Sequence, residues 1–103
     1  MLLIREIMYC KPGKVRPMVE KSLAMSKLNE KLGMGKIRVL TDFAAEQYWT
    51  IVMEMEVPSL EAFEKMMTGQ GMSEQDTKQF DELMKGYHDL VDHGRREIFK
   101  IEG

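Results

Sequence analysis

KIRVLTDFAAEQYWTIVMEMEV, residues 36–57, decides the fold, because it contains two β-rich runs separated by a short link. The runs cover residues 36–43 and 48–57, and a link of this length joins neighbouring antiparallel strands. In the second run, apolar side chains starting at Trp49 alternate with mixed ones, so one face of the strand is apolar. We predict a β-hairpin whose apolar face, including Trp49, packs under helices.

Upstream of the hairpin, the sequence predicts a strand followed by a helix. Residues 2–10, LLIREIMYC, are apolar and end at the turn signal Lys11-Pro12-Gly13. Apolar residues then recur at helical spacing from Val15 to Leu32, and Gly33 ends the helix.

Downstream of the hairpin, the pattern indicates two helices and a last strand. Ser59 is a plausible N-cap for a short helix that the Gly-Gln-Gly of residues 69–71 ends. Ser73, with an acidic residue three positions later, resembles a capping box for a longer helix that runs to Gly94. Residues 95–101 then alternate as a strand.

This order of elements limits the topology to few arrangements. Right-handed crossovers favour a four-stranded antiparallel sheet in the order 4-1-3-2, with all helices on one face. We predict an α+β, ferredoxin-like β-α-β-β-α-β fold in one domain over residues 1–103.

Composition and charge narrow the possible partners. Apolar residues make up 44% of the chain and charged residues 31%, which is ordinary for a folded globular domain. The net charge is -2, so no strong positive field would attract nucleic acid. The lone Cys10 cannot form an intramolecular disulfide, and charges follow closely on Met1, so we expect a cytoplasmic protein with no export signal and no membrane partner.

One face of the predicted sheet has no helix to cover it. It would display mostly apolar side chains, among them Ile7, Tyr9, Leu40, Tyr48 and Val52. Burying each Leu- or Val-sized side chain contributes about 1.5–3 kcal/mol, so a second copy could cover this face by symmetric contact. We predict a homodimer, with a monomer whose exposed face is half polar as the alternative.

The first strand and its turn resemble a known group of proteins. Ile4-Arg5-Glu6-Ile7-Met8-Tyr9, followed by Lys11-Pro12-Gly13-Lys14 and a helix, is similar to the opening of NIPSNAP-like and antibiotic-biosynthesis-monooxygenase-like proteins. Both belong to the dimeric α/β-barrel superfamily. The resemblance implies two facing sheets and small, largely apolar or aromatic ligands.

The resemblance also implies two kinds of chemistry. Some members oxidise polycyclic aromatics without a cofactor, and others degrade haem with an asparagine on a strand together with a Trp and a His. The only asparagine here, Asn29, lies in the predicted first helix, which argues against haem degradation. We expect no cofactor, and no Cys/His/Asp spacing predicts a metal site.

Tyr87 and His88 are the candidate catalytic residues, because a histidine near a carboxylate can act as a base. His93 lies beside the glycine predicted to end the helix, where we expect it to cap the last turn.

Arg5, Arg38, Tyr48 and Glu54 are the candidate ligand-binding residues. The charged members lie on predicted strands, where burial requires an opposite charge or a bound anion. A structural salt bridge at the dimer seam is the alternative.

Three functions remain open. The first is a homodimer that binds a small apolar or aromatic molecule, and the eleven methionines, several on predicted core faces, would suit a permissive pocket. The second is a cofactor-independent monooxygenase acting on quinol-type aromatics. The third is a structural or interaction module.

Overall fold

A computed structural model describes residues 1–103, and its elements follow the predicted order. They are β1 (Leu2–Cys10), α1 (Val15–Lys31), β2 (Arg38–Thr41), β3 (Thr50–Val57), α2 (Leu60–Thr68), α3 (Glu74–Met84), α4 (Tyr87–Leu90) and β4 (Val91–Lys100). The four strands form one sheet in the order β2-β3-β1-β4, and every neighbouring pair is antiparallel. The predicted α+β, ferredoxin-like topology is therefore confirmed.

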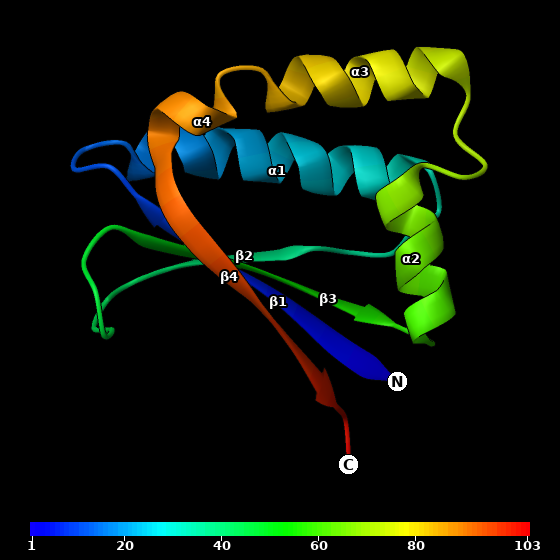
Figure 1. The fold of residues 1–103 in the computed structure, drawn as a ribbon, viewed down its shortest axis with the longest axis horizontal. Helices are drawn as coiled ribbons and strands as arrows, with labels where there is room; N and C mark the ends of the chain where they lie inside the picture. Colours follow the sequence, from blue (N-terminus) through cyan, green and yellow to red (C-terminus); the bar gives the residue numbers. More distant parts are fainter.

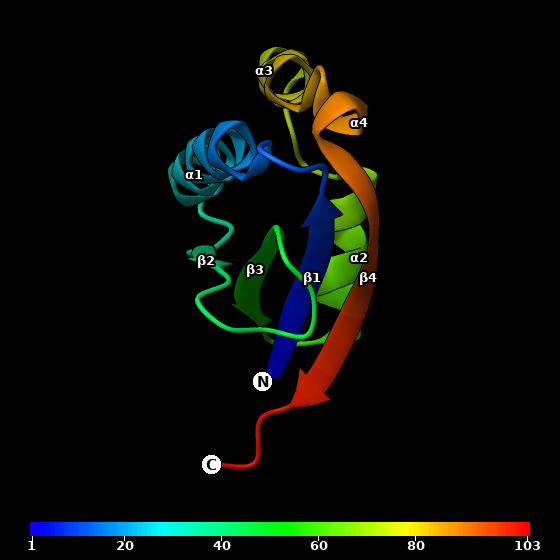
Figure 2. The ribbon, with the colours of Figure 1, turned by 90° about the vertical axis from the view of Figure 1, so that its left-hand side faces the viewer.

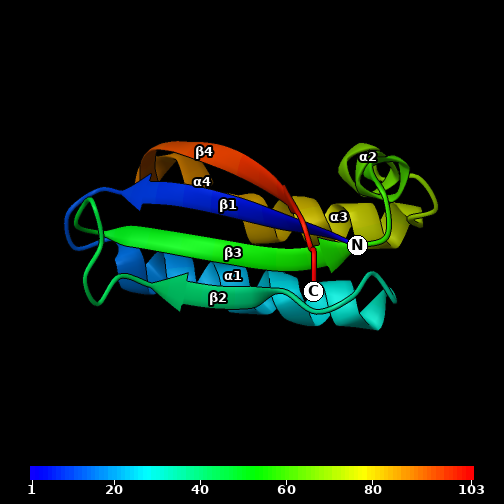
Figure 3. The same cartoon turned by 90° about the horizontal axis from the view of Figure 1, so that it is seen from below.

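The helices lie on one side of the sheet. Figures 1 and 2 show α1 along the sheet, with α3 and α4 further out and α2 near one end of the strands. The opposite side, called the open face below, carries no helix (Figure 3). None of the helices combines the length and apolar character needed to cross a bilayer.

The core follows from the alternation along the two central strands. Ile4 and Met8 of β1 and Ile51 and Val57 of β3 are buried against the helices, as the period of two requires. The apolar stripe of α1, which includes Met18, covers this face.

The last helix is shorter than predicted. It ends at Met84, and Gly86 adopts a left-handed conformation (φ 83°) that separates it from the single turn α4. β4 begins at Val91, so the prediction that Gly94 ends a helix is wrong. The residues around Gly94 instead join the β1 ladder, because pairing along the whole of β1 outweighs the local helical pattern.

Gly94 is required by a close approach between β4 and β1. A Cβ atom there would lie 2.8 Å from the backbone oxygen of Ile7 and 3.4 Å from Cγ of Met8. We expect Gly94→Ala to lower the free energy of unfolding by about 1–3 kcal/mol, because the strand must move to accept the methyl group. Urea unfolding measures the loss. Lys100→Ala, at the exposed end of the same strand, should change stability by less than about 0.5 kcal/mol, and an equal loss there would contradict this explanation.

Trp49 does not pack under a helix, which corrects a second prediction. It precedes β3 with φ 61° and is 43% exposed. The Thr50 N–H donates to Asp42 Oδ1 (2.9 Å) and the Thr50 hydroxyl donates to the Gln47 carbonyl (2.8 Å). These side-chain bonds stabilise a turn in place of continued strand pairing, so the hairpin strands are shorter than the sequence pattern indicates.

Candidate ligand-binding cavity

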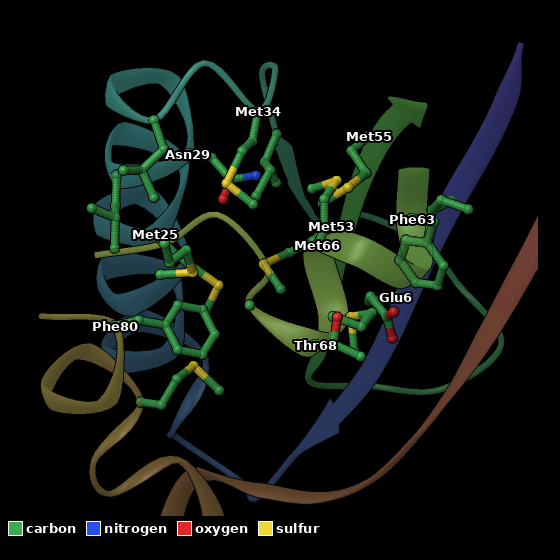
Figure 4. Close-up of a pocket in the computed structure, with 18 of the residues that line it drawn as sticks. Glu6, Met25, Asn29, Met34, Met53, Met55, Phe63, Met66, Thr68 and Phe80 are labelled. Carbon is green, nitrogen blue, oxygen red and sulfur yellow. The ribbon is translucent and has the colours of Figure 1, made fainter. Parts of the chain in front are cut away.

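A cavity of about 530 Å³ lies between the helix-covered face of the sheet and the helices. β1 and β3 line its floor, α1 lines one wall, and α2 and α3 close the rest (Figure 4). Seventeen of its 24 lining residues are hydrophobic, so the cavity is an apolar space with a few polar groups.

Methionine dominates the lining. Ten of the eleven methionines contribute to it, and Met1 is the exception. The ten are Met8, Met18, Met25, Met34, Met53, Met55, Met66, Met67, Met72 and Met84. Figure 4 shows sulfur atoms on several sides of the same hollow. Because methionine side chains are unbranched and polarisable, this lining can adapt to apolar molecules of different shapes.

The helix α3 roofs the cavity without reaching the sheet. It packs mainly on α1 and contains no buried residue. Its first turn is capped by the Ser73 hydroxyl, which accepts a hydrogen bond from the Asp76 N–H, as the capping signal predicted. At its other end, Nζ of Lys21 on α1 donates to the carbonyls of Leu83 (3.2 Å) and Lys85 (2.5 Å). These hydrogen bonds hold the end of α3 against α1, and the cavity remains between α3 and the sheet.

Asn29 places a polar group in this apolar surface. The residue is only 8% exposed and lines the cavity from α1, and none of the side-chain hydrogen bonds of the protein includes its carboxamide. From the sequence, Asn29 served only as an argument against haem degradation, because the chain's one asparagine is not on a strand. One signal was available, because Asn29 lies four residues after Met25 and so falls on the apolar stripe of the helix.

A charged pair lies at the β1–β4 side of the cavity. Nε of Arg96 donates to Glu6 Oε1, and both residues line the cavity. The Arg96 guanidinium also lies 5.1 Å from the centre of the Phe63 ring. Each charge thus has a partner before any ligand enters.

Tyr87 and His88 lie beside each other on α4, and Tyr87 alone of the two lines the cavity. The Tyr87 hydroxyl donates to the sulfur of Met8 (3.4 Å), and the ring centres of Tyr87 and His88 are 5.1 Å apart, edge to face. Burial, with smaller contributions from Glu6 and Cys10, raises the pKa of Tyr87 above its ordinary value. The phenol therefore keeps its proton at neutral pH.

His93 does not cap a helix, because it lies in β4. Its ring lies next to the Tyr9 ring, tilted by 38° with 4.7 Å between centres, and its Nδ1 is 2.9 Å from Asp92 Oδ2. No group of three His, Cys, Asp or Glu side chains is arranged to hold a metal ion.

The predicted ligand-binding residues lie on the open face, away from the methionine-lined cavity. Arg38, Glu54, Arg5 and Glu97 are register partners in one line across β2, β3, β1 and β4, and this line is called the charge row below. The spacings are 2.5 Å from Arg38 to Glu54, 2.9 Å from Glu54 to Arg5 and 3.4 Å from Arg5 to Glu97. The structure thus joins three of the predicted residues in one network.

Two features complete the open face. Arg38 and Glu54 also line a smaller hollow of about 360 Å³, so their predicted role in ligand binding stays a prediction. Tyr48 lies apart from the charge row in the β2–β3 link and is 86% exposed.

Comparison with solved structures shows what this fold resembles. A NIPSNAP-like domain protein from Burkholderia xenovorans superposes with a TM-score of 0.76 at 11% identity, covering 97% of this chain and 84% of that one. An antibiotic biosynthesis monooxygenase gives 0.71 at 12% identity, with full coverage of both chains. A putative antibiotic biosynthesis monooxygenase from Deinococcus radiodurans gives 0.66 at 9% identity, covering 100% of this chain and 94% of that one.

These likenesses confirm the predicted resemblance at the level of the fold. No protein-family model and no curated protein sequence matches the chain. The chemistry of this chain must therefore be argued from its own residues.

Proposed function

We propose that this protein binds a small, flexible apolar molecule in the methionine-lined cavity. The observation that carries the proposal is the gathering of ten of the eleven methionines around one space of about 530 Å³. That volume falls within the range of roughly 300–1,000 Å³ typical of small-molecule sites.

Native mass spectrometry of freshly purified protein and titration with a neutral fluorescent probe, N-phenyl-1-naphthylamine, test this proposal. We expect one probe molecule per chain, with the emission increase that follows transfer of the dye from water to an apolar site. No emission change at any probe concentration, together with a ligand-free mass, would exclude an accessible apolar site.

We further propose that a second copy of the chain covers the open face. Ile7 and Val52 lie next to the charge row on this face, and Leu40 continues the apolar line to the sheet edge with 38% exposure. The exposed aromatic side chains of Phe43 and Tyr48 extend the surface beyond the strands. Burial against a copy would remove Leu40, Val52 and the two aromatic side chains from water, whereas Ile7 is already only 5% exposed in one chain.

The charge row supports an identical partner. Read from β2 to β4, its signs run plus, minus, plus, minus, so the row carries no net charge. A two-fold axis parallel to the strands would place the charge row of the copy opposite this row, running in the reverse order. Each cation would then face an anion of the copy: Arg38 opposite the partner's Glu97, and Glu54 opposite the partner's Arg5. An axis across the strands would oppose like charges.

A cofactor-independent monooxygenase acting on quinol-type aromatics is the second candidate, favoured by the position of Tyr87 in the cavity lining with the exposed His88 beside it. Because Tyr87 holds its proton, His88 is the better candidate base for an activated phenol, and the apolar cavity would shelter the resulting carbanion. Oxygen uptake with a panel of hydroquinones, lost in His88→Ala, would support this activity. Uptake that persists in His88→Ala and Tyr87→Phe would remove both residues from the chemistry.

A further inference from the structure

We infer that the ligand is uncharged and carries a hydrogen-bonding oxygen, such as an alcohol or a ketone, which the Asn29 carboxamide binds. This inference rests on the proposed apolar site and specifies the chemical class of its occupant.

The first argument is the state of the Asn29 side chain. The residue is more than nine-tenths buried, no hydrogen bond joins its carboxamide to the protein, and the amide atoms keep some surface accessible from the cavity. Figure 4 shows the side chain leaving α1 and entering the hollow beside Met34. Because the amide is accessible from the cavity and has no protein partner, a polar atom of a ligand in the hollow can form a hydrogen bond with it.

The charges around the cavity disfavour an anionic ligand. Asn29 lies in the last turn of α1, where the carbonyl end of the helix carries partial negative charge and disfavours an anion. Arg96 is the one cationic residue in the cavity lining, and it is already paired with Glu6. A carboxylate entering the cavity would therefore lose its hydration without gaining a free cation.

The Asn29 carboxamide can bind more than one kind of uncharged oxygen group. A carboxamide offers both a donor and an acceptor, so it can bind a ketone through its NH₂ group and an alcohol through either group. The surrounding Met25, Leu28, Leu32 and Ile37 side chains offer no competing polar contact. Recognition of the polar atom thus falls to Asn29 alone at this end of the cavity.

The inference predicts opposite effects of one substitution on stability and on binding. Replacing Asn29 by leucine removes a polar group from a mostly apolar lining and keeps a similar volume. The ligand-free Asn29→Leu protein should therefore unfold at a higher urea concentration than wild type. If the carboxamide had a structural partner, the same change would lower the urea midpoint, and that result would overturn the inference.

Binding is measured by displacing N-phenyl-1-naphthylamine with octane, 1-octanol, 2-octanone and octanoate. Wild type should bind octanoate roughly tenfold or more weakly than 1-octanol at pH 7. In Asn29→Leu, the affinity for 1-octanol and 2-octanone should fall about tenfold, and the affinity for octane should stay unchanged. Gln75→Leu, which makes the same amide-to-leucine change at an exposed position of α3 outside the lining, should bind all four like wild type.

The outcomes separate this inference from the proposed function. If octane displaces the probe but Asn29→Leu binds 1-octanol and 2-octanone with wild-type affinity, the inference fails and the apolar site stands. Binding of octanoate as tight as that of 1-octanol would also overturn it. If the probe itself does not bind, the apolar site fails, and the inference fails with it.

Discussion

Met66→Trp will remove binding of apolar probes and leave the protein folded. Met66 lies on α2, and Figure 4 shows its side chain in the middle of the cavity, so an indole there enters existing empty space. The indole would take the space in which a ligand is buried, and losing about 2.8 kcal/mol of apolar burial makes binding about 100-fold weaker. Titration with N-phenyl-1-naphthylamine measures the change.

The control is Leu23→Trp, which adds an indole on the exposed side of α1 outside the cavity lining. It should bind the probe like wild type. Filling a cavity commonly leaves stability unchanged or raises it, so the melting temperature of Met66→Trp should not fall. Full probe binding by the stable Met66→Trp protein would show that the probe occupies another site.

Arg38→Glu will dissociate the proposed dimer at concentrations where wild type associates. The side chain is 71% exposed and Glu54 keeps its second partner, Arg5, at 2.9 Å, so the monomer should stay folded although the new charge beside Glu54 lowers its stability. In the arrangement inferred from the charge row, residue 38 would face the partner's Glu97 twice per dimer, and both contacts would become repulsive. We expect the dimer Kd to rise about tenfold or more. Sedimentation equilibrium over a range of micromolar concentrations measures it.

The double variant Arg38→Glu with Glu97→Arg tests the orientation of the two copies. The two positions lie on opposite edge strands, so they do not contact each other within one chain. Rescue of association by the second reversal would thus require contact between copies. Lys27→Glu, which makes the same charge change on the exposed side of α1, is the control. A wild-type chain that stays monomeric and folded at these concentrations would overturn the proposed interface.

The fold was predictable because its central strands carry their pattern locally. β1 spans the residues that the sequence indicated, and Ser59 and Ser73 cap their helices as predicted. The errors arise where contacts between distant residues outweigh local pattern. The segment from Val91 pairs with β1 although its apolar spacing continues a helix, and the turn at Trp49 depends on hydrogen bonds from Thr50.

The candidate site was less predictable than the fold. Periodicity places methionines on buried faces, but it does not show that α3 stands away from the sheet, and this separation creates the cavity. A lone asparagine on an apolar stripe has no motif, so only the structure shows that its amide faces a cavity without a protein partner. The charge row likewise needs strand register, because its members come from four separate segments.

The way α3 is attached has a consequence for how molecules reach the interior. A helix with no buried residue can detach at little cost, because the sheet and α1 keep their own core when it leaves. Its amide hydrogens should exchange with deuterated solvent far sooner than those of β1. The protein would then admit a guest by transient local opening, at a rate set by one marginally stable segment.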